Sequence, residues 1–125
     1  MNRYDPLNEP KPDEWLAIDD QERVSLIAGF HKKAGVHLPN HTLHAAMHAV
    51  VENQLAEGVP VPCETLSRLI QEGLDRHDAV HAIGSVLAEH IFSVLNKGAG
   101  GDPNERYYQA LRTLTAAKWR SLSPR

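Results

Sequence analysis

The feature that most constrains the fold is a long apolar segment that follows Asp75 and ends near Asn96. Its large apolar residues recur at helical spacing, and small residues such as Gly84 and Ala88 widen the apolar surface nearly all round. Such a helix must be covered on several sides, because one neighbour cannot hide its whole circumference from water. The segment therefore predicts the central helix of a bundle. The large residues are Val80, Ile83, Leu87, Ile91 and Val94.

Other segments of the chain also have helical periodicity and recognisable helix ends. Gly35, Gly58 and Gly73 are expected to end three of these helices, since glycine readily adopts the left-handed conformation of a C-terminal cap. Asp75 is expected to cap the start of the long apolar helix. No segment has the alternating β-branched pattern of a strand. With 125 residues, 42% of them hydrophobic, the chain is predicted to be an all-α single bundle of four to five helices. The further helices are expected over residues 20–34, 41–57, 64–72 and 104–122.

Composition divides the chain into a body and a tail. The body, 1–96, begins with a proline-rich arm over 1–12, which is expected to be extended. A Gly-rich linker at 97–103 precedes a basic amphipathic helix at 104–122. From Asn96 onward the net charge is +4, against -7 before it, so we expect the tail to bind its own body or an acidic partner. The tail's aromatic residues suggest a docking face, and a homodimer is one form it would take.

Histidines are abundant, and three pairs of them are four residues apart. His37 and His41 lie on either side of Pro39 and are not expected to share a helix, which leaves two pairs. His44 and His48, and likewise His77 and His81, are four residues apart within predicted helices. About 0.45 such pairs would be expected by chance for eight histidines. A separation of four places both rings on one helix face, where two nitrogens can converge on one metal ion. We expect the two helices to pack roughly antiparallel and to offer four nitrogens.

Two acidic residues extend the faces that carry these histidines. Glu52 lies four residues after His48, and Glu89 lies eight residues after His81. Each is a candidate ligand, or an acceptor that orients a ligand. Imidazole donors suit a divalent metal such as Zn or Fe, and a carboxylate ligand favours iron. Histidines at the edge of an apolar face are also often structural, so a metal-free protein-interaction module remains the alternative.

The paired motifs resemble those of an uncharacterised bacterial family known only as a domain of unknown function. The resemblance rests on H-x3-H-x3-E-x-Q from His44 to Gln54, followed by His77, His81 and Glu89. It covers residues 38–95 well, covers the front of the chain weakly and excludes the tail after Gly98. It implies a small helical domain with these residues at signature positions, and it implies no mechanism.

Other functional classes lack their motifs. The pairs are not HExxH, because Ala45 and Asp78 occupy the position of the metalloprotease base. No catalytic motif is recognisable, so the sequence leaves enzyme activity open. DNA binding through the basic tail or a helix-turn-helix is the less favoured alternative, since the helix after Gly73 is apolar. With no secretion signal and polar breaks in its apolar segments, the chain is expected to be cytoplasmic and not membrane-spanning.

Overall fold

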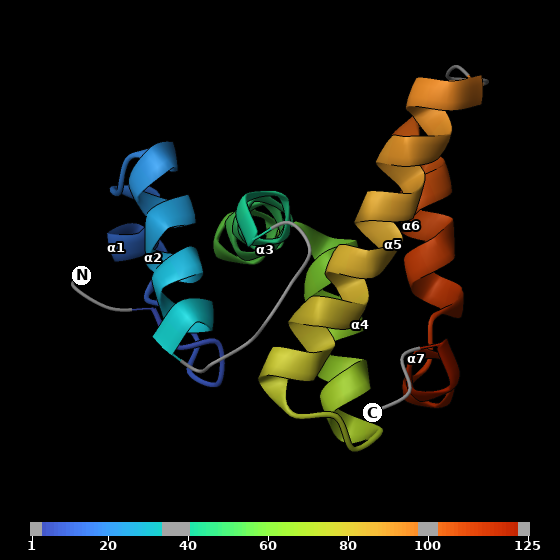
Figure 1. The fold of residues 1–125 in the computed structure, drawn as a ribbon. Helices are drawn as coiled ribbons and strands as arrows, with labels where there is room; N and C mark the ends of the chain where they lie inside the picture. Colours follow the sequence, from blue (N-terminus) through green and yellow to red (C-terminus); the bar gives the residue numbers. More distant parts are fainter. Residues whose placement is uncertain (1–3, 34–40, 98–102, 123–125) are drawn as a thin grey trace. The chain divides into compact units, whose positions relative to one another are not determined.

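The computed structural model describes residues 4–33, 41–97 and 103–122. Within these residues every regular element is a helix, so the predicted all-α class is confirmed. The chain forms two compact units, Met1–Val59 and Pro60–Arg125 (Figure 1). One predicted histidine pair lies in each unit, and the antiparallel packing of the two helices stays a prediction.

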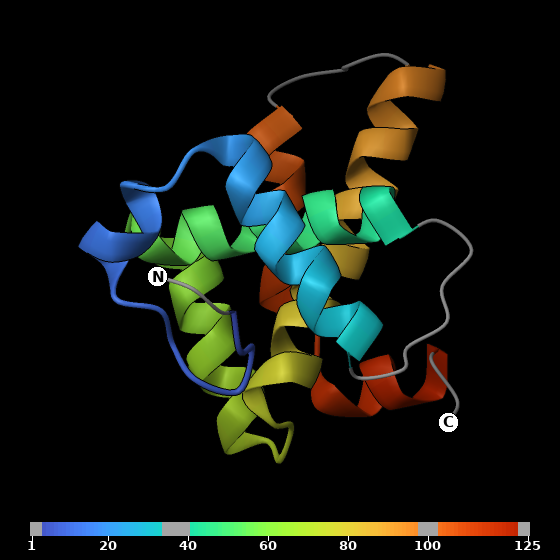
Figure 2. The same ribbon diagram turned by 60° about the vertical axis from the view of Figure 1, so that its left-hand side comes forward.

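The first unit contains three helices: α1 (Pro12–Leu16), α2 (Asp20–Lys33) and α3 (His41–Ala56). Figure 2 shows α2 crossing α3, and α1 also packs on α3. Trp15 is fully buried and anchors α1 in this unit. The segment before α1 is not simply extended, because a turn joins the Asn8 amide to the Asp5 carbonyl. The buried core of this unit comprises Tyr4, Trp15, Ile27, Ala45 and Ala49.

Asn53 and the buried Arg23 connect all three helices of this unit. The Asn53 side-chain oxygen accepts hydrogen bonds from the Trp15 indole at 2.9 Å and from Arg23 Nη1 at 2.9 Å. Arg23 also donates to the Leu16 carbonyl at 2.8 Å and to Asp20 at 3.0 Å. Because a buried guanidinium is costly unless it is hydrogen-bonded, these contacts fix the helices in one arrangement.

The predicted glycine caps at Gly58 and Gly73 are confirmed, and the third, at Gly35, lies outside the described residues. Gly58 has φ 71° and Gly73 has φ 107°, values that residues with a Cβ rarely adopt. At the first cap, the Val59 amide donates to the Gln54 carbonyl at 3.0 Å, and Leu74 bonds to Leu69 in the same way at 3.1 Å. These are the six-to-one hydrogen bonds of a Schellman motif, which ends a helix.

The second unit contains four helices: α4 (Pro60–Gln71), α5 (Arg76–Lys97), α6 (Pro103–Thr113) and α7 (Ala116–Leu122). Helices α4 and α5 form a hairpin, and α6 runs back alongside both (Figure 1). Asp75 caps α5 as predicted, because its carboxylate accepts the Asp78 amide hydrogen at 2.8 Å. Val80, Ile83 and Leu87 are buried, as a central helix requires, but Ile91 is exposed and Val94 is only half-buried, so the predicted coverage fails in the last two turns of α5.

Two helix boundaries differ from the sequence predictions. Helix α4 begins at Pro60 rather than at residue 64, because proline at the first helical position has a suitable φ and needs no amide partner. The expected 104–122 helix is interrupted at Leu114 and Thr115, giving α6 and α7. Thr115 caps α7 by accepting the Lys118 amide hydrogen at 3.1 Å.

Arg68 and Glu72 of α4 hold this interruption in place. Arg68 donates to the carbonyls of Leu111 at 3.0 Å and Leu114 at 2.5 Å, which are left open where α6 ends. Glu72 accepts the Ala116 amide hydrogen at 2.8 Å at the start of α7. This bond lowers the pKa of Glu72; desolvation opposes the shift, and Arg68 adds to it.

Helix α5 is also long and apolar enough to cross a membrane, contrary to the expectation from its polar breaks. The stretch Arg76–Leu95 has a mean hydropathy of 1.2, and it is the single such helix in the described part of the chain. One helix of this kind is weak support for a membrane protein, because core helices of soluble proteins pass the same test. Its packing against α4 and α6 buries Val80, Ile83 and Leu87, whereas Ile91, Phe92 and Leu95 stay exposed.

Candidate metal centre

Helix α3 brings His44 and His48 together as the four-residue spacing predicts. Their rings stack with centroids 5.3 Å apart and an interplanar angle of 29°. A ligand nitrogen of one ring lies within 4.8 Å of a ligand nitrogen of the other. Two nitrogens on one tetrahedral zinc ion lie about 3.4 Å apart, so small side-chain rotations would bring the pair to a ligating geometry.

The Tyr4 hydroxyl joins His48 to Glu52 in a buried hydrogen-bonded chain. Tyr4 donates its proton to Glu52 Oε2 at 2.5 Å, and its oxygen lies 3.3 Å from His48 Nδ1. Since the single hydroxyl proton is used by Glu52, the Tyr4 oxygen can only accept from His48. With Tyr4 as the donor to Glu52, a neutral His48 is assigned the tautomer with its proton on Nδ1 and its lone pair on Nε2.

The Glu52 carboxylate reaches His48 through the Tyr4 hydroxyl. This is the arrangement of an acceptor that orients a histidine ligand. Tyr4, His48 and Glu52 are each at most 2% exposed. Burial of these polar groups is tolerated because they hydrogen-bond to one another.

Burial on α3 does not follow the helical spacing of its large apolar residues. Leu55 is buried, but Met47 and Val50 are only half-buried, and the side chain of Leu43 is not among those that the structure describes. Burial is complete on the face that carries His48 and Glu52. Polar residues occupy that face because Tyr4 and Trp15 supply hydrogen bonds there, and hydropathy alone does not detect this.

Tyr4 is the site residue that sequence reasoning missed. It lies in the proline-rich arm, where the pattern predicted no ordered element. Its ring packs against Trp15 with centroids 5.6 Å apart, and it meets the His48 ring edge-on at 6.0 Å. The only signal was that an aromatic residue stands in an otherwise polar arm, since such a residue needs a place to be buried.

Helix α5 brings the second pair together in the same way. The rings of His77 and His81 lie 4.4 Å apart between centroids and meet at 65°, and both side chains are half-buried. The pair sits in the first two turns of α5, where Asp75 caps the helix start. The local backbone is therefore well fixed around these two imidazoles.

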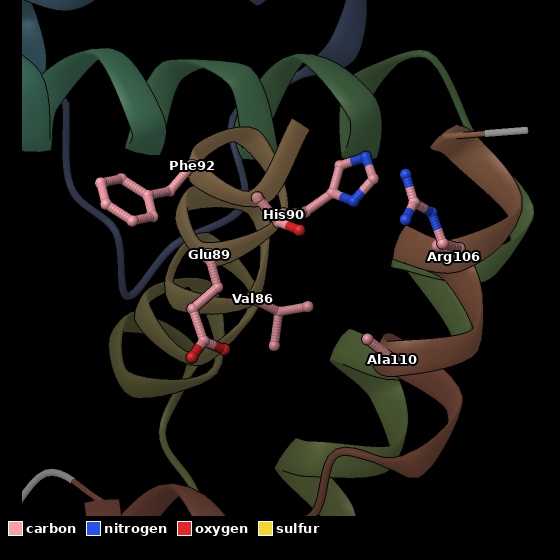
Figure 3. A pocket seen from close by; sticks show the side chains of 7 residues that line it. Val86, Glu89, His90, Phe92, Arg106 and Ala110 are labelled. Carbon is pink, nitrogen blue, oxygen red and sulfur yellow. The ribbon is translucent and has the colours of Figure 1, made fainter. Parts of the chain in front are cut away.

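Glu89 lies apart from this pair on the same helix. Eight residues correspond to about 12 Å along the axis of an α-helix. Its side chain is exposed and lines a groove with His90 and Arg106 (Figure 3). The structure thus places Glu89 away from His77 and His81 and closer to a different set of groups.

Comparison with known families agrees with the resemblance read from the motifs. A family model described as a domain of unknown function, DUF1841, matches residues 10–113. The chain belongs to the DUF1841 family. The match continues beyond Gly98, so limiting the resemblance to residues 38–95 was too narrow; α6 is part of this DUF1841 domain. No curated protein and no solved structure matches the chain.

Proposed function

We propose that this DUF1841 protein binds one divalent metal ion, Zn or Fe, through its paired histidines. The two histidines of each pair, His44 and His48 on α3 and His77 and His81 on α5, would supply the imidazole ligands. Three protein ligands with an open position are typical of catalytic zinc, whereas four are typical of structural zinc. The proposal does not extend to a reaction.

The observation that carries the proposal is the state of His48. Tyr4 and Glu52 hold its Nδ1 as the donor, which leaves the lone pair on Nε2, the form in which an imidazole binds a metal. An outer carboxylate that fixes the tautomer is a common feature of histidine metal sites. The close contact within each histidine pair adds to this support.

A metal-free interaction module is the competing function. The same hydrogen-bonded chain would then serve to bury His48 and Glu52 inside the first unit, and the histidines would be packing residues. Both proposals assume the same fold, but only the first expects the protein to bind a metal ion when one is added.

Calorimetric titration of Zn²⁺ into chelator-treated, untagged protein tests the proposal. We expect one ion per chain with a Kd below about 1 µM, a modest affinity for a site with several histidines. His44→Ala and His81→Ala should each weaken binding at least tenfold, because each removes a ligand of the same ion. Both side chains are half-buried, so these variants are chosen to preserve the fold.

His90→Ala is the matched control, since His90 is a half-buried histidine of α5 outside both pairs. It should bind Zn²⁺ as the wild type does. Two ions per chain, with each variant losing only one of them, would contradict a shared site. A wild type that binds no ion below about 100 µM would refute the proposal and favour the interaction module.

A further inference from the structure

A second candidate binding site lies on the surface of the second unit, between α5 and α6. It is an open groove with a volume of about 370 Å³ (Figure 3). This volume falls near the lower end of the range of about 300–1,000 Å³ that is usual for small-molecule sites. The groove is lined by Val86, Glu89, His90, Phe92, Ser93, Arg106 and Ala110.

Most of the surface that lines the groove is apolar. Val86 and Ala110 face each other from α5 and α6 (Figure 3). Phe92 also belongs to the lining and is 70% exposed, but Figure 3 shows its ring directed away from Arg106 and His90. Val86 and Ala110 are therefore the apolar residues that can contact the body of a ligand bound at Arg106.

Arg106 gives the groove a cation that no internal acid neutralises. Arg23, Arg68 and Arg112 each form an ion pair with a carboxylate, whereas Arg106 has no such contact among the described residues. In Figure 3 its guanidinium and the His90 ring turn into the same space. A planar guanidinium with several donors matches a carboxylate, which it binds through two parallel hydrogen bonds.

His90 is positioned to assist Arg106. Its ring stacks on the buried Tyr107 of α6, with centroids 5.8 Å apart and an angle of 29°. Glu89 is the one acidic group in the lining, and Figure 3 shows its carboxylate directed away from Arg106 and His90. The groove therefore has a cationic end with an apolar floor beside it.

We propose that this groove binds a small organic carboxylate with an apolar acyl or aryl body. Arg106 and His90 would bind the carboxylate, and Val86 and Ala110 would contact the apolar body. The proposal is independent of the metal site, since none of these residues belongs to the histidine pairs.

Amide-detected NMR titration of the full chain with octanoate, in the presence of chelator, tests this inference. We expect saturable shifts at Val86, Ser93 and Ala110 with a Kd of about 1 mM or tighter, as suits a ligand of this size. Arg106→Gln should weaken binding at least tenfold. Arg112→Gln is the matched control, because Arg112 is an exposed arginine of α6 that pairs with Glu105 outside the lining.

Two further ligands separate the contribution of the carboxylate from that of the apolar body. Octanol keeps the apolar body and lacks the charge, whereas acetate keeps the charge and lacks the body; each should bind at least tenfold more weakly than octanoate. Equal affinity for octanol and octanoate would overturn the role of Arg106. An equal loss in the Arg112→Gln variant, or shifts that do not saturate, would overturn the site itself.

Discussion

Replacing Tyr4 with phenylalanine tests the buried hydrogen-bonded chain of the first unit. The change removes one hydroxyl that donates to Glu52 at 2.5 Å and lies 3.3 Å from His48 Nδ1. Hydrogen bonds to charged groups contribute about 1.5–3 kcal/mol, and the acceptor left behind is fully buried. We therefore expect a loss of about 2–3 kcal/mol in the free energy of unfolding, or about 10 °C in Tm.

Urea unfolding of metal-free protein in a Trp119→Phe background is the appropriate assay. Trp15, buried in the first unit, then becomes the only tryptophan and reports on that unit. Tyr108→Phe is the matched control, because the Tyr108 hydroxyl makes no hydrogen bond within the described part of the chain. Its free energy of unfolding should differ from that of the wild type by less than about 0.5 kcal/mol. If Tyr4→Phe also lowers the free energy of unfolding by less than about 0.5 kcal/mol, the hydrogen bonds from Tyr4 to Glu52 and His48, and the tautomer assigned to His48, would be refuted.

Three further predictions concern the second unit and the helix ends. The pKa of Glu72 is lowered from 4.5 in the folded state, so this carboxylate stabilises the fold above that value and stops doing so as the pH falls through the folded pKa. In melting experiments at pH 3–6, the Tm of Glu72→Gln should therefore fall less with acidification than the Tm of the wild type. In urea unfolding, Gly58→Ala should lower the free energy of unfolding by about 1 kcal/mol, because this position has a φ of 71°. Gly29→Ala, at an open position within α2, should raise it by about 0.5–1 kcal/mol. Equal effects of the two substitutions would contradict the role of Gly58 as a cap. Arg68→Met removes the donors to two α6 carbonyls and should speed hydrogen exchange in α6 and α7 at least tenfold, while unchanged exchange would count against that role.

The features that the sequence predicted well are those determined by neighbouring residues. The caps at Gly58, Gly73 and Asp75 each depend on a few residues that are close in the chain, and all three are present. The four-residue spacing likewise suffices to bring the histidines of each pair together, because helix geometry alone places them on one face.

The features that the sequence did not predict depend on residues far apart in the chain. Tyr4 and Glu52 are separated by 48 positions, so no local pattern indicates that a phenol will cover the polar face of α3. The interruption of the last predicted helix at Leu114 similarly depends on Arg68, which is 46 positions earlier. Tertiary hydrogen bonds decide both cases, and periodicity contains no information about them.

Elemental analysis of untagged protein is the most direct test of the central claim, that paired histidines bind a metal ion. The wild type, purified without chelator, should contain about one Zn or Fe per chain. A folded His44→Ala/His81→Ala variant should contain almost none, with its helical content verified by circular dichroism. A folded wild type with no metal, which also gains none after incubation with Zn²⁺ or Fe²⁺, would contradict the claim and leave the histidines as packing residues.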